Sequence, residues 1–144
     1  MFRHLFTYKP LHTDLGLSIT RVVFGLLFCY HGLEKILNYS SFSTNFPDPI
    51  GLGITTSLLL VIFAEFVGGV AVTLGLLTRF FLIPIFITMS VALFIVHAQD
   101  PFQTKELALL FWVISIGIYV TGPGKYSVDK LIYDYQYNKN KIAL

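Results

Sequence analysis

Long apolar runs separated by short polar segments dominate this chain. A helix needs roughly 20 consecutive, mostly apolar residues to cross the hydrocarbon core of a bilayer. The runs that meet or approach this length are residues 15–37, 55–77, 80–96 and 102–121. We therefore predict an all-α protein with a transmembrane four-helix bundle over residues 15–124, a segment 1–14 before it and a tail 125–144 after it.

The polar segments predict where the helices end. Asp100 is placed to cap a helix that starts at Pro101, and Gln103 completes a capping box. The sequence Gly122-Pro123-Gly124 ends the same helix. The longest connection, residues 38–54, is expected to lie at the membrane interface as a short lid, and the tyrosine-rich tail is expected to be interfacial as well.

Composition supports a membrane protein and excludes several other classes. Of the 144 residues, 55% are hydrophobic and only 12% are charged, about half the usual share in soluble proteins. The net charge of +2 and the scattered lysines do not make the basic patch that nucleic-acid binding requires. Cys29 is the only cysteine, so a redox function within one copy needs a quinone, a metal or the thiols of a partner.

The distribution of Lys and Arg predicts the orientation of the bundle, because cytoplasmic loops carry an excess of these residues. Most of them belong to the end that holds both termini: Arg3, Lys9, Arg21, Arg79, Lys125, Lys130, Lys139 and Lys141. Lys35 and Lys105 lie toward the opposite end. We predict a multi-pass protein with both termini in the cytoplasm, whose first apolar run stays as a span and is not cleaved as a signal peptide.

Glu65 is the ionisable residue that most needs an explanation. It lies near the middle of the second run, where a charge is costly to insert into a membrane. One interpretation is structural, with Glu65 paired to an arginine that holds the bundle together. The other is functional, with Glu65 as a carboxylate that transfers protons or binds a ligand. The sequence leaves both interpretations open.

Arg21 is the predicted partner of Glu65. The helical rise places Arg21 about 9 Å and Glu65 about 18 Å above the cytoplasmic ends of their helices, a gap that an arginine side chain can largely span. Arg79, between the second and third runs, is expected to be a second structural charge. Small residues recur on one face of the first two helices and predict close packing. They are Gly25 and Gly32 in the first run, and Ala64, Gly68, Ala71 and Gly75 in the second.

Further polar residues lie at matched depth toward the other end of the bundle. His31 and His97 are both about 24 Å above the cytoplasmic ends of their helices. The charged residues at this level are Glu34, Lys35, Lys105 and Glu106. With aromatic walls, this set predicts a pocket for a quinone or thiol compound in which His and Glu move protons, unless each His only packs. No metal site is predicted, because no His-x3-His or Glu-x2-His pair is present.

Several short motifs follow one another in an order that resembles the DoxX family. They are Arg21, His31-Gly32-x-x-Lys35, Glu65-x-x-Gly68-Gly69, Gly75-x-x-Thr78-Arg79, His97, Glu106 and Gly122-Pro123-Gly124-x-x-Ser127-x-Asp129. The resemblance covers roughly residues 15–129 and leaves out both ends of the chain.

The resemblance implies a four-helix protein of a bacterial inner membrane, in agreement with the predicted spans. It also implies a connection with oxidoreductases, since relatives include the small subunit of thiosulfate:quinone oxidoreductase and anchors of complexes that handle thiol or oxidative stress. The family's polar pattern matches this chain at Arg21, His31, Lys35, Glu65, Arg79, His97 and Glu106.

The leading hypothesis is a membrane subunit of an oxidoreductase that binds a quinone or small redox substrate near the outer leaflet. The candidate residues are Glu65 and His31 for catalysis, His97, Glu106 and Lys35 for substrate binding, and Arg21 and Arg79 as structural charges. A quinone is the one cofactor that this hypothesis suggests. The expected partners are lipid and either other subunits or further copies of the chain, with no nucleic acid. The alternatives are a non-catalytic anchor or assembly subunit and, less favoured, a small oligomeric transporter.

Overall fold

The computed structural model describes residues 12–142, and every regular element in this part of the chain is a helix. Four stretches among these residues are long and apolar enough to cross a membrane, which confirms the predicted all-α transmembrane bundle. The first span is α1 (Thr13–Leu37), and the last is α6 (Phe102–Thr121). The second span combines α3 (Ile54–Ile62), η2 (Phe63–Val67) and α4 (Gly68–Leu74), and the third combines α5 (Thr78–Val91) and η3 (Ala92–Val96). Two helices lie outside the spans, α2 (Tyr39–Asn45) and α7 (Val128–Ile142).

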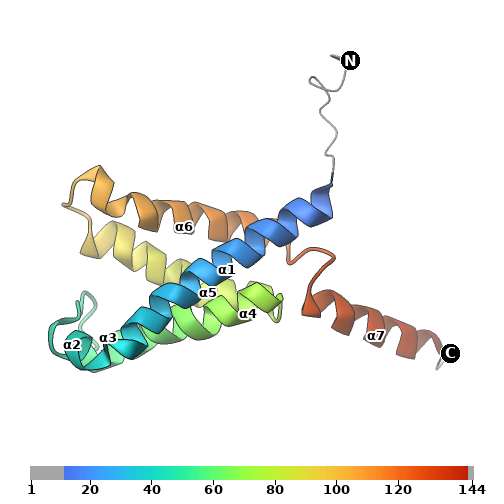
Figure 1. Cartoon of the computed structure of the whole chain (residues 1–144), viewed down its shortest axis with the longest axis horizontal. Helices are drawn as coiled ribbons and strands as arrows, with labels where there is room; N and C mark the ends of the chain where they lie inside the picture. Colours follow the sequence, from blue (N-terminus) through green and yellow to red (C-terminus); the bar gives the residue numbers. More distant parts are fainter. Residues whose placement is uncertain (1–11, 143–144) are drawn as a thin grey trace, which may run out of the picture.

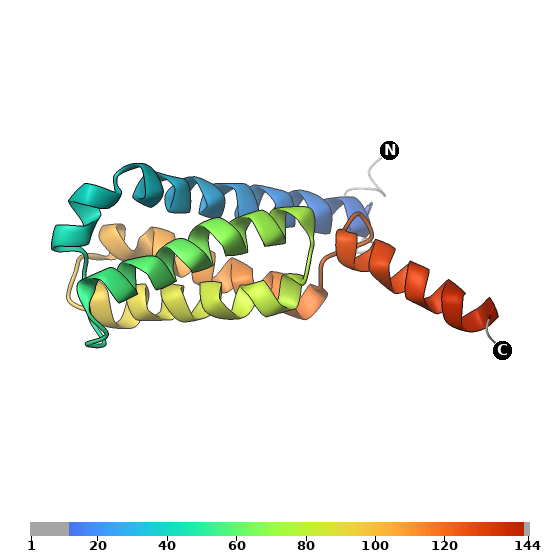
Figure 2. The same cartoon turned by 90° about the horizontal axis from the view of Figure 1, so that it is seen from below.

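The spans run alternately in opposite directions, so the two ends of the bundle carry different connections (Figures 1 and 2). One end carries α2 and residues 97–101, and we call it the α2 end. The other carries the start of α1, the turn between α4 and α5, and the start of α7, and we call it the α7 end. Both ends of the described chain therefore lie at the α7 end, which the charge distribution predicts to be cytoplasmic. Arg3 and Lys9, which contribute to that prediction, lie outside the described residues.

The observed helix ends confirm some of the predicted stop signals and correct others. Gly122 ends α6 with a left-handed φ of 82°, as predicted. Gly75, at φ 70°, ends α4 after Leu74, three residues earlier than the sequence pattern suggested. The predicted cap at Asp100 is wrong, because no side chain caps the start of α6. The Asp100 carboxylate instead contacts His97, with 2.8 Å between Oδ2 and Nδ1.

Glycines bring α1 into close contact with η2 and α4. A Cβ atom on Gly32 would lie 2.4 Å from the backbone nitrogen of Phe66, and one on Gly69 would lie 2.5 Å from that of Cys29. Both distances are far shorter than real Cβ contacts, so the two backbones touch directly. Gly68 turns away from α1 and lies under the side chain of Ile85 in α5. The small residues of the second span thus serve two different interfaces.

Substitution of Gly69 by Ala is expected to lower the free energy of unfolding by about 1–3 kcal/mol, because the added methyl group meets backbone atoms that cannot rotate away. Gly117→Ala in α6 is the matched control, since nothing lies within 4 Å of a Cβ at that position. The control should be neutral or slightly stabilising. Denaturant unfolding in detergent, followed by circular dichroism, compares the two variants. An equal loss in both would show that packing at Gly69 is unimportant.

Arg21 joins three segments of the chain at the α7 end. The side chain is buried, with 2% of its surface exposed. It donates hydrogen bonds to the carbonyl oxygens of Val72 at 2.8 Å and of Thr73 in α4. It also donates to the carbonyls of Pro123 at 2.9 Å and Tyr126 at 2.6 Å, in the segment between α6 and α7. One guanidinium therefore satisfies backbone groups from the second span and from the segment that follows the fourth.

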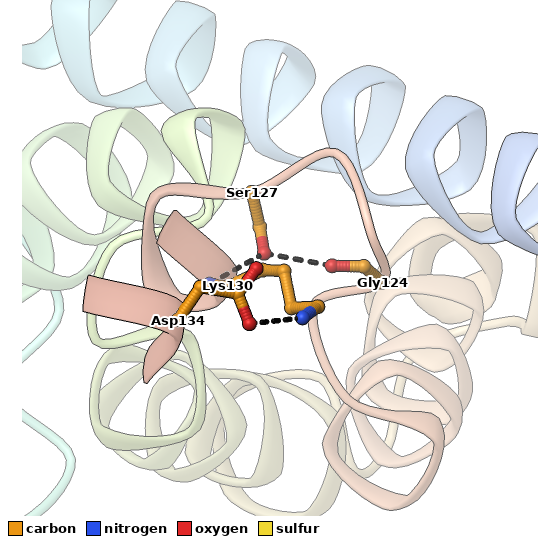
Figure 3. A network of polar contacts seen from close by, with 4 residues as sticks. All are labelled: Gly124, Ser127, Lys130 and Asp134. Carbon is orange, nitrogen blue, oxygen red and sulfur yellow. Dashed lines mark hydrogen bonds and ion pairs between the residues drawn. The ribbon is translucent and has the colours of Figure 1, made fainter. Parts of the chain in front are cut away.

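The start of α7 is fixed by a side-chain cap (Figure 3). Ser127 donates from Oγ to the carbonyl of Gly124 at 2.7 Å and accepts from the backbone N–H of Lys130 at 3.2 Å. A serine that accepts from the third residue after it is a helix N-cap. Lys130 in turn pairs with Asp134 one turn further along the helix. The tail expected to be interfacial is thus a defined helix, and Figures 1 and 2 show it projecting away from the bundle.

Asp129, in the first turn of α7, ties this helix to the turn between α4 and α5. Its carboxylate accepts from the backbone N–H groups of Leu77 at 2.7 Å and Thr78 at 3.0 Å, and from the Thr78 hydroxyl at 2.8 Å. These are free N–H groups at the start of α5, where a negative charge is favourable. The Ser127-x-Asp129 motif therefore closes the α7 end of the bundle.

Candidate functional site

A cavity of about 380 Å³ lies inside the bundle toward the α2 end. Its walls come from all four spans, and residues 46–50, in the connection between α2 and α3, close it from the α2 end. Most of the lining is apolar. The polar side chains that line it are His31, Lys35, Ser57, Glu65, Thr88, His97 and Thr104. Ligand sites in proteins typically have this size and this mixture of apolar walls with a few polar groups.

Lys35 and Glu65 form an ion pair in the cavity wall. The distance from Lys35 Nζ to Glu65 Oε2 is 2.7 Å, and the two side chains are 16% and 7% exposed. The predicted pairing of Glu65 with Arg21 is therefore wrong. Arg21 lies at the α7 end and binds backbone carbonyls, whereas Lys35 reaches Glu65 from the α2 end of α1. The buried carboxylate thus has a partner that also faces the cavity.

Two π-helical turns shape the walls of this cavity. Glu65 lies inside η2, and His97 directly follows η3, with its backbone N–H bonded to the carbonyl of Ala92 at 2.9 Å. A π-turn accommodates one extra residue in the helix, so the residues in and after it face a different direction. Such turns are frequent at functional sites. No simple pattern in the sequence marks either turn, and neither turn was predicted.

His31 lies four residues before Lys35, so both side chains occupy the same face of α1 and reach the same cavity. The His31 ring packs edge-on against Phe111 of α6, with 5.9 Å between ring centroids. Phe111 also contacts Phe28 at 4.7 Å, and both phenyl rings belong to the cavity wall. The imidazole therefore lies against an aromatic wall of the cavity that the ion pair also lines.

His97 lies at the α2 end of the cavity and is oriented by Asp100. The 2.8 Å contact between Nδ1 and the carboxylate favours a proton on Nδ1, and Nε2 is then the ring nitrogen that can accept a hydrogen bond. Lys105, predicted at the same level, donates instead to the carbonyl of Ala98 at 3.2 Å. His97 is thus a partly exposed member of the site, at the opposite wall from α1.

The predicted convergence holds for His31, Glu65 and His97, but not for Glu106, which is exposed and does not line the cavity. The inward face of α6 carries Thr104, Ala108 and Phe111. A residue two positions from Thr104 points to nearly the opposite side of a helix, which explains the position of Glu106.

Arg79 also lies outside the cavity. It is exposed at the α7 end and donates from Nε to the carbonyl of Tyr119 at 3.1 Å. This bond connects the start of α5 with the last turn of α6. Such a contact is compatible with the structural charge that was predicted at Arg79. The catalytic and binding roles assigned to the other candidates remain predictions.

A compact loop over the cavity contains residues that were not predicted to belong to the site. Asp48 accepts from the backbone N–H groups of Leu52 at 2.9 Å and Gly53 at 2.8 Å, and from the Ser57 hydroxyl at 2.8 Å. These bonds fasten residues 46–50 to the first turn of α3. An Asp between two prolines, followed by glycines, is a common turn-forming pattern and was the available signal in the sequence. The lid predicted from residues 38–54 thus has a defined latch.

The latch is expected to open in acid. The Ser57 hydroxyl, together with the amides of Gly53 and Leu52, lowers the pKa of the Asp48 carboxyl below its usual value. A group with a lowered pKa stabilises the folded loop above the unfolded pKa of about 3.9, and this contribution is lost as pH falls through the folded pKa. We expect hydrogen exchange, corrected for intrinsic rates, to show the amides of Leu52 and Gly53 losing protection below about pH 4.

The variant Asp48→Ala should show the same loss of protection already at neutral pH. The amide of Asn38, which bonds to the carbonyl of Glu34, is an internal control that should not respond to either change. Full protection of Leu52 and Gly53 in the Asp48→Ala variant would contradict the latch.

The donor set of the cavity suits an uncharged or weakly polar ring better than a metal ion. Within residues 12–142, no group of three His, Cys, Asp or Glu side chains is close enough to hold a metal ion. The ammonium of Lys35 and the two imidazoles can donate hydrogen bonds to carbonyl oxygens, and the aromatic walls can pack against a ring. His31 and Glu65 are also groups that can accept and release protons.

Comparison with known proteins assigns the chain to a family. The family model described as DoxX matches residues 16–98, more than half of the chain, a range that includes both members of the ion pair and both histidines of the cavity. This chain belongs to the DoxX family. The match confirms the resemblance that the motifs indicated.

Two curated proteins of similar length match most of this DoxX chain. "Putative oxidoreductase CatD" of Bacillus subtilis (strain 168) is 29% identical over 132 residues, which cover 90% of this chain and 96% of that protein. "Inner membrane protein YqjF" of Escherichia coli (strain K12) is 33% identical over 126 residues, which cover 83% of this chain and 93% of that protein. No solved structure matches the chain. The four spans and the family together make this a multi-pass membrane protein.

Proposed function

We propose that this protein is a membrane subunit of an oxidoreductase in a bacterial inner membrane, and that its cavity binds a quinone or another small redox compound. The observation that carries the proposal is the Lys35–Glu65 ion pair beside His31 in an otherwise largely apolar cavity. Buried charges in a membrane bundle are functional by default, and these face a space that a ring can occupy. The names of the two relatives, "Putative oxidoreductase CatD" and "Inner membrane protein YqjF", support the same function.

The proposed site gives each polar group a chemical role. Reduction of a quinone to a quinol takes two electrons and two protons. A single cysteine cannot supply the electrons as a dithiol, so a partner subunit with its own thiols or redox centre is the electron donor. His31 supplies a proton to one ring oxygen, and the Lys35 ammonium, which holds the other oxygen by a hydrogen bond, supplies the second. Glu65 and His31 then take up protons from water, so that both groups return to their starting state. The excess of Lys and Arg at the α7 end supports a position of the cavity near the outer leaflet.

The intrinsic fluorescence of Trp112, the only tryptophan, provides a binding assay. Trp112 packs against the core that includes the cavity-lining residues Phe28, Met89 and Phe111, so it lies close to the cavity wall. We expect decylubiquinone to quench it in proteoliposomes, and Glu65→Gln to weaken this binding at least about tenfold, the effect of losing a charge-assisted contact. Glu106→Gln is the matched control, because Glu106 lies at the same end of the bundle but outside the cavity. Equal binding by all three proteins would contradict the proposal.

A second function, that of a non-catalytic anchor, is favoured by one separate observation. α7 projects beyond the bundle, and the side chains of Leu131 and Tyr135 on it are 68% and 71% exposed. Exposed apolar groups on a helix outside the bundle are typical of surfaces that bind partner proteins. In that case deletion of residues 131–144 abolishes partner capture from membranes, and the unmodified protein binds no quinone. The oxidoreductase proposal predicts that the cavity variants, and not this deletion, abolish quinone binding.

A further inference from the structure

We infer that the ligand reaches the cavity sideways, from the lipid phase, through a gap between α3 and α5. The inference rests on the proposed function and narrows its substrate class. The compound is a lipid-dissolved molecule with a small polar ring and an apolar chain, and not a water-soluble thiol. The ring lies at the Lys35–Glu65 pair, and the chain extends through the gap between the helices.

The packing of the spans creates this gap. At the α7 end, α4 packs against both α1 and α5. Toward the α2 end, α3 packs on α1, α2 and η2, whereas α5 packs on η2, η3 and α6. Figure 1 shows the result, with α5 and α6 separating from α1 and α3 toward the end that carries α2. The second and third spans thus part where the cavity begins.

The side chains along the gap belong both to the cavity and to the lipid-facing surface. Leu60 and Val61 of α3 and Ile87 and Val91 of α5 line the cavity. Leu60 is 51% exposed and Ile87 is 54% exposed, although both lie within membrane-spanning helices. A side chain that is exposed on a span and also lines the cavity lies at an opening toward lipid. This opening is bordered by aliphatic groups on both helices.

The face of the cavity toward the α2 end is covered by the loop. Phe46, Pro47, Pro49 and Ile50 line the cavity from that direction, and Asp48 fastens the loop to α3. A ligand from the aqueous phase therefore has to displace a latched segment. A ligand in the bilayer meets aliphatic side chains, and a charged compound would lose its hydration on that route at high cost. Both features select a neutral molecule that is already dissolved in lipid.

The rate of association with decylubiquinone tests the route. In proteoliposomes, stopped-flow quenching of Trp112 should slow at least about tenfold in the double variant Leu60→Phe/Ile87→Phe, because the larger side chains must move before the ring can pass. Leu59→Phe is the matched control, since Leu59 is equally exposed on the same helix, at 51%, but does not line the cavity. Ile87→Ala widens the gap and should accelerate association. Asp48→Ala opens the loop and should leave the rate within about twofold.

The outcomes separate the route from the function. Normal association in Leu60→Phe/Ile87→Phe together with faster association in Asp48→Ala would overturn lateral access and place the route at the loop. In that case binding by the unmodified protein still supports the proposed function. Absence of any quenching by decylubiquinone in the unmodified protein would overturn the proposed function, and the inference with it.

Discussion

Replacement of Arg21 by Met is expected to destabilise the bundle by roughly 3–5 kcal/mol, one of the largest effects of any single substitution in this chain. The guanidinium donates to four backbone carbonyls, those of Val72, Thr73, Pro123 and Tyr126. Hydrogen bonds from a charged donor are stronger than neutral ones, and buried carbonyls that lose their donor keep the full desolvation penalty. Thermal unfolding in detergent measures the loss, and purification yield reports it independently.

Arg21→Lys should rescue only a small part of this stability. An ammonium is a compact donor on a flexible stem, whereas the planar guanidinium reaches carbonyls on two segments from fixed directions. Arg79→Met is the control, because Arg79 is exposed and donates one bond of 3.1 Å to Tyr119. Its loss should be about 1 kcal/mol or less. A full rescue by Lys, or an equal effect of Arg79→Met, would show that the four-carbonyl network does not stabilise the fold.

The position of Arg21 also explains why its predicted pairing with Glu65 was wrong. The prediction used the height of each residue along its own helix and allowed a difference of about 9 Å. In the observed register of α1 against the second span, this difference in height is too large for Arg21 to reach Glu65. Gly32 lies against Phe66 and Gly25 against Thr73, so Arg21 is level with the end of α4, and Lys35 with η2. The register depends on which residues the glycines of α1 contact in the second span. The sequence of each helix taken by itself does not determine these contacts.

The parts that were predictable from sequence are those governed by local physical chemistry. The length of the apolar runs determines the spans, and Gly122 ends α6 because it adopts a left-handed φ of 82°. The matched heights of His31 and His97 along their helices likewise predicted that both line one cavity, as they do. The extra residue in η2 and η3 was not predictable, because a π-turn depends on the tertiary contacts that stabilise it. Asp100 failed as a helix cap for a similar reason, since the nearby imidazole of His97 binds its carboxylate.

The tail illustrates how a local pattern can indicate an environment without indicating the type of structure. Its tyrosines and lysines suggested a segment at the membrane interface, but Ser127 and Asp129 begin a helix and attach its first turn to the bundle. α7 then leaves the bundle at the end where the lysine count predicts cytoplasm (Figure 2). The aromatic residues are therefore exposed on a projecting helix, where they form the surface assigned above to a protein partner.

The ion pair in the cavity is expected to show strong energetic coupling. Lys35→Met leaves the Glu65 carboxylate, 7% exposed, without its cation, and should destabilise the protein by roughly 3–5 kcal/mol at neutral pH. Glu65→Gln should cost less, because the longer and more exposed Lys35 side chain can turn its ammonium toward water. The double variant Lys35→Met/Glu65→Gln removes both charges, so it should lose clearly less than the sum of the single variants.

The matched control is the pair formed by Lys130 and Asp134 in α7, whose side chains are 42% and 49% exposed. Water and salt screen a pair at such a surface, so its coupling energy should be about 0.5 kcal/mol or less. Unfolding of both sets of variants in the same detergent gives the two coupling energies under one condition. Coupling between Lys35 and Glu65 as weak as that of the control would mean that water already solvates the pair. The cavity would then be too wet to strengthen a hydrogen bond to a quinone, and the anchoring function would be the better explanation of the fold.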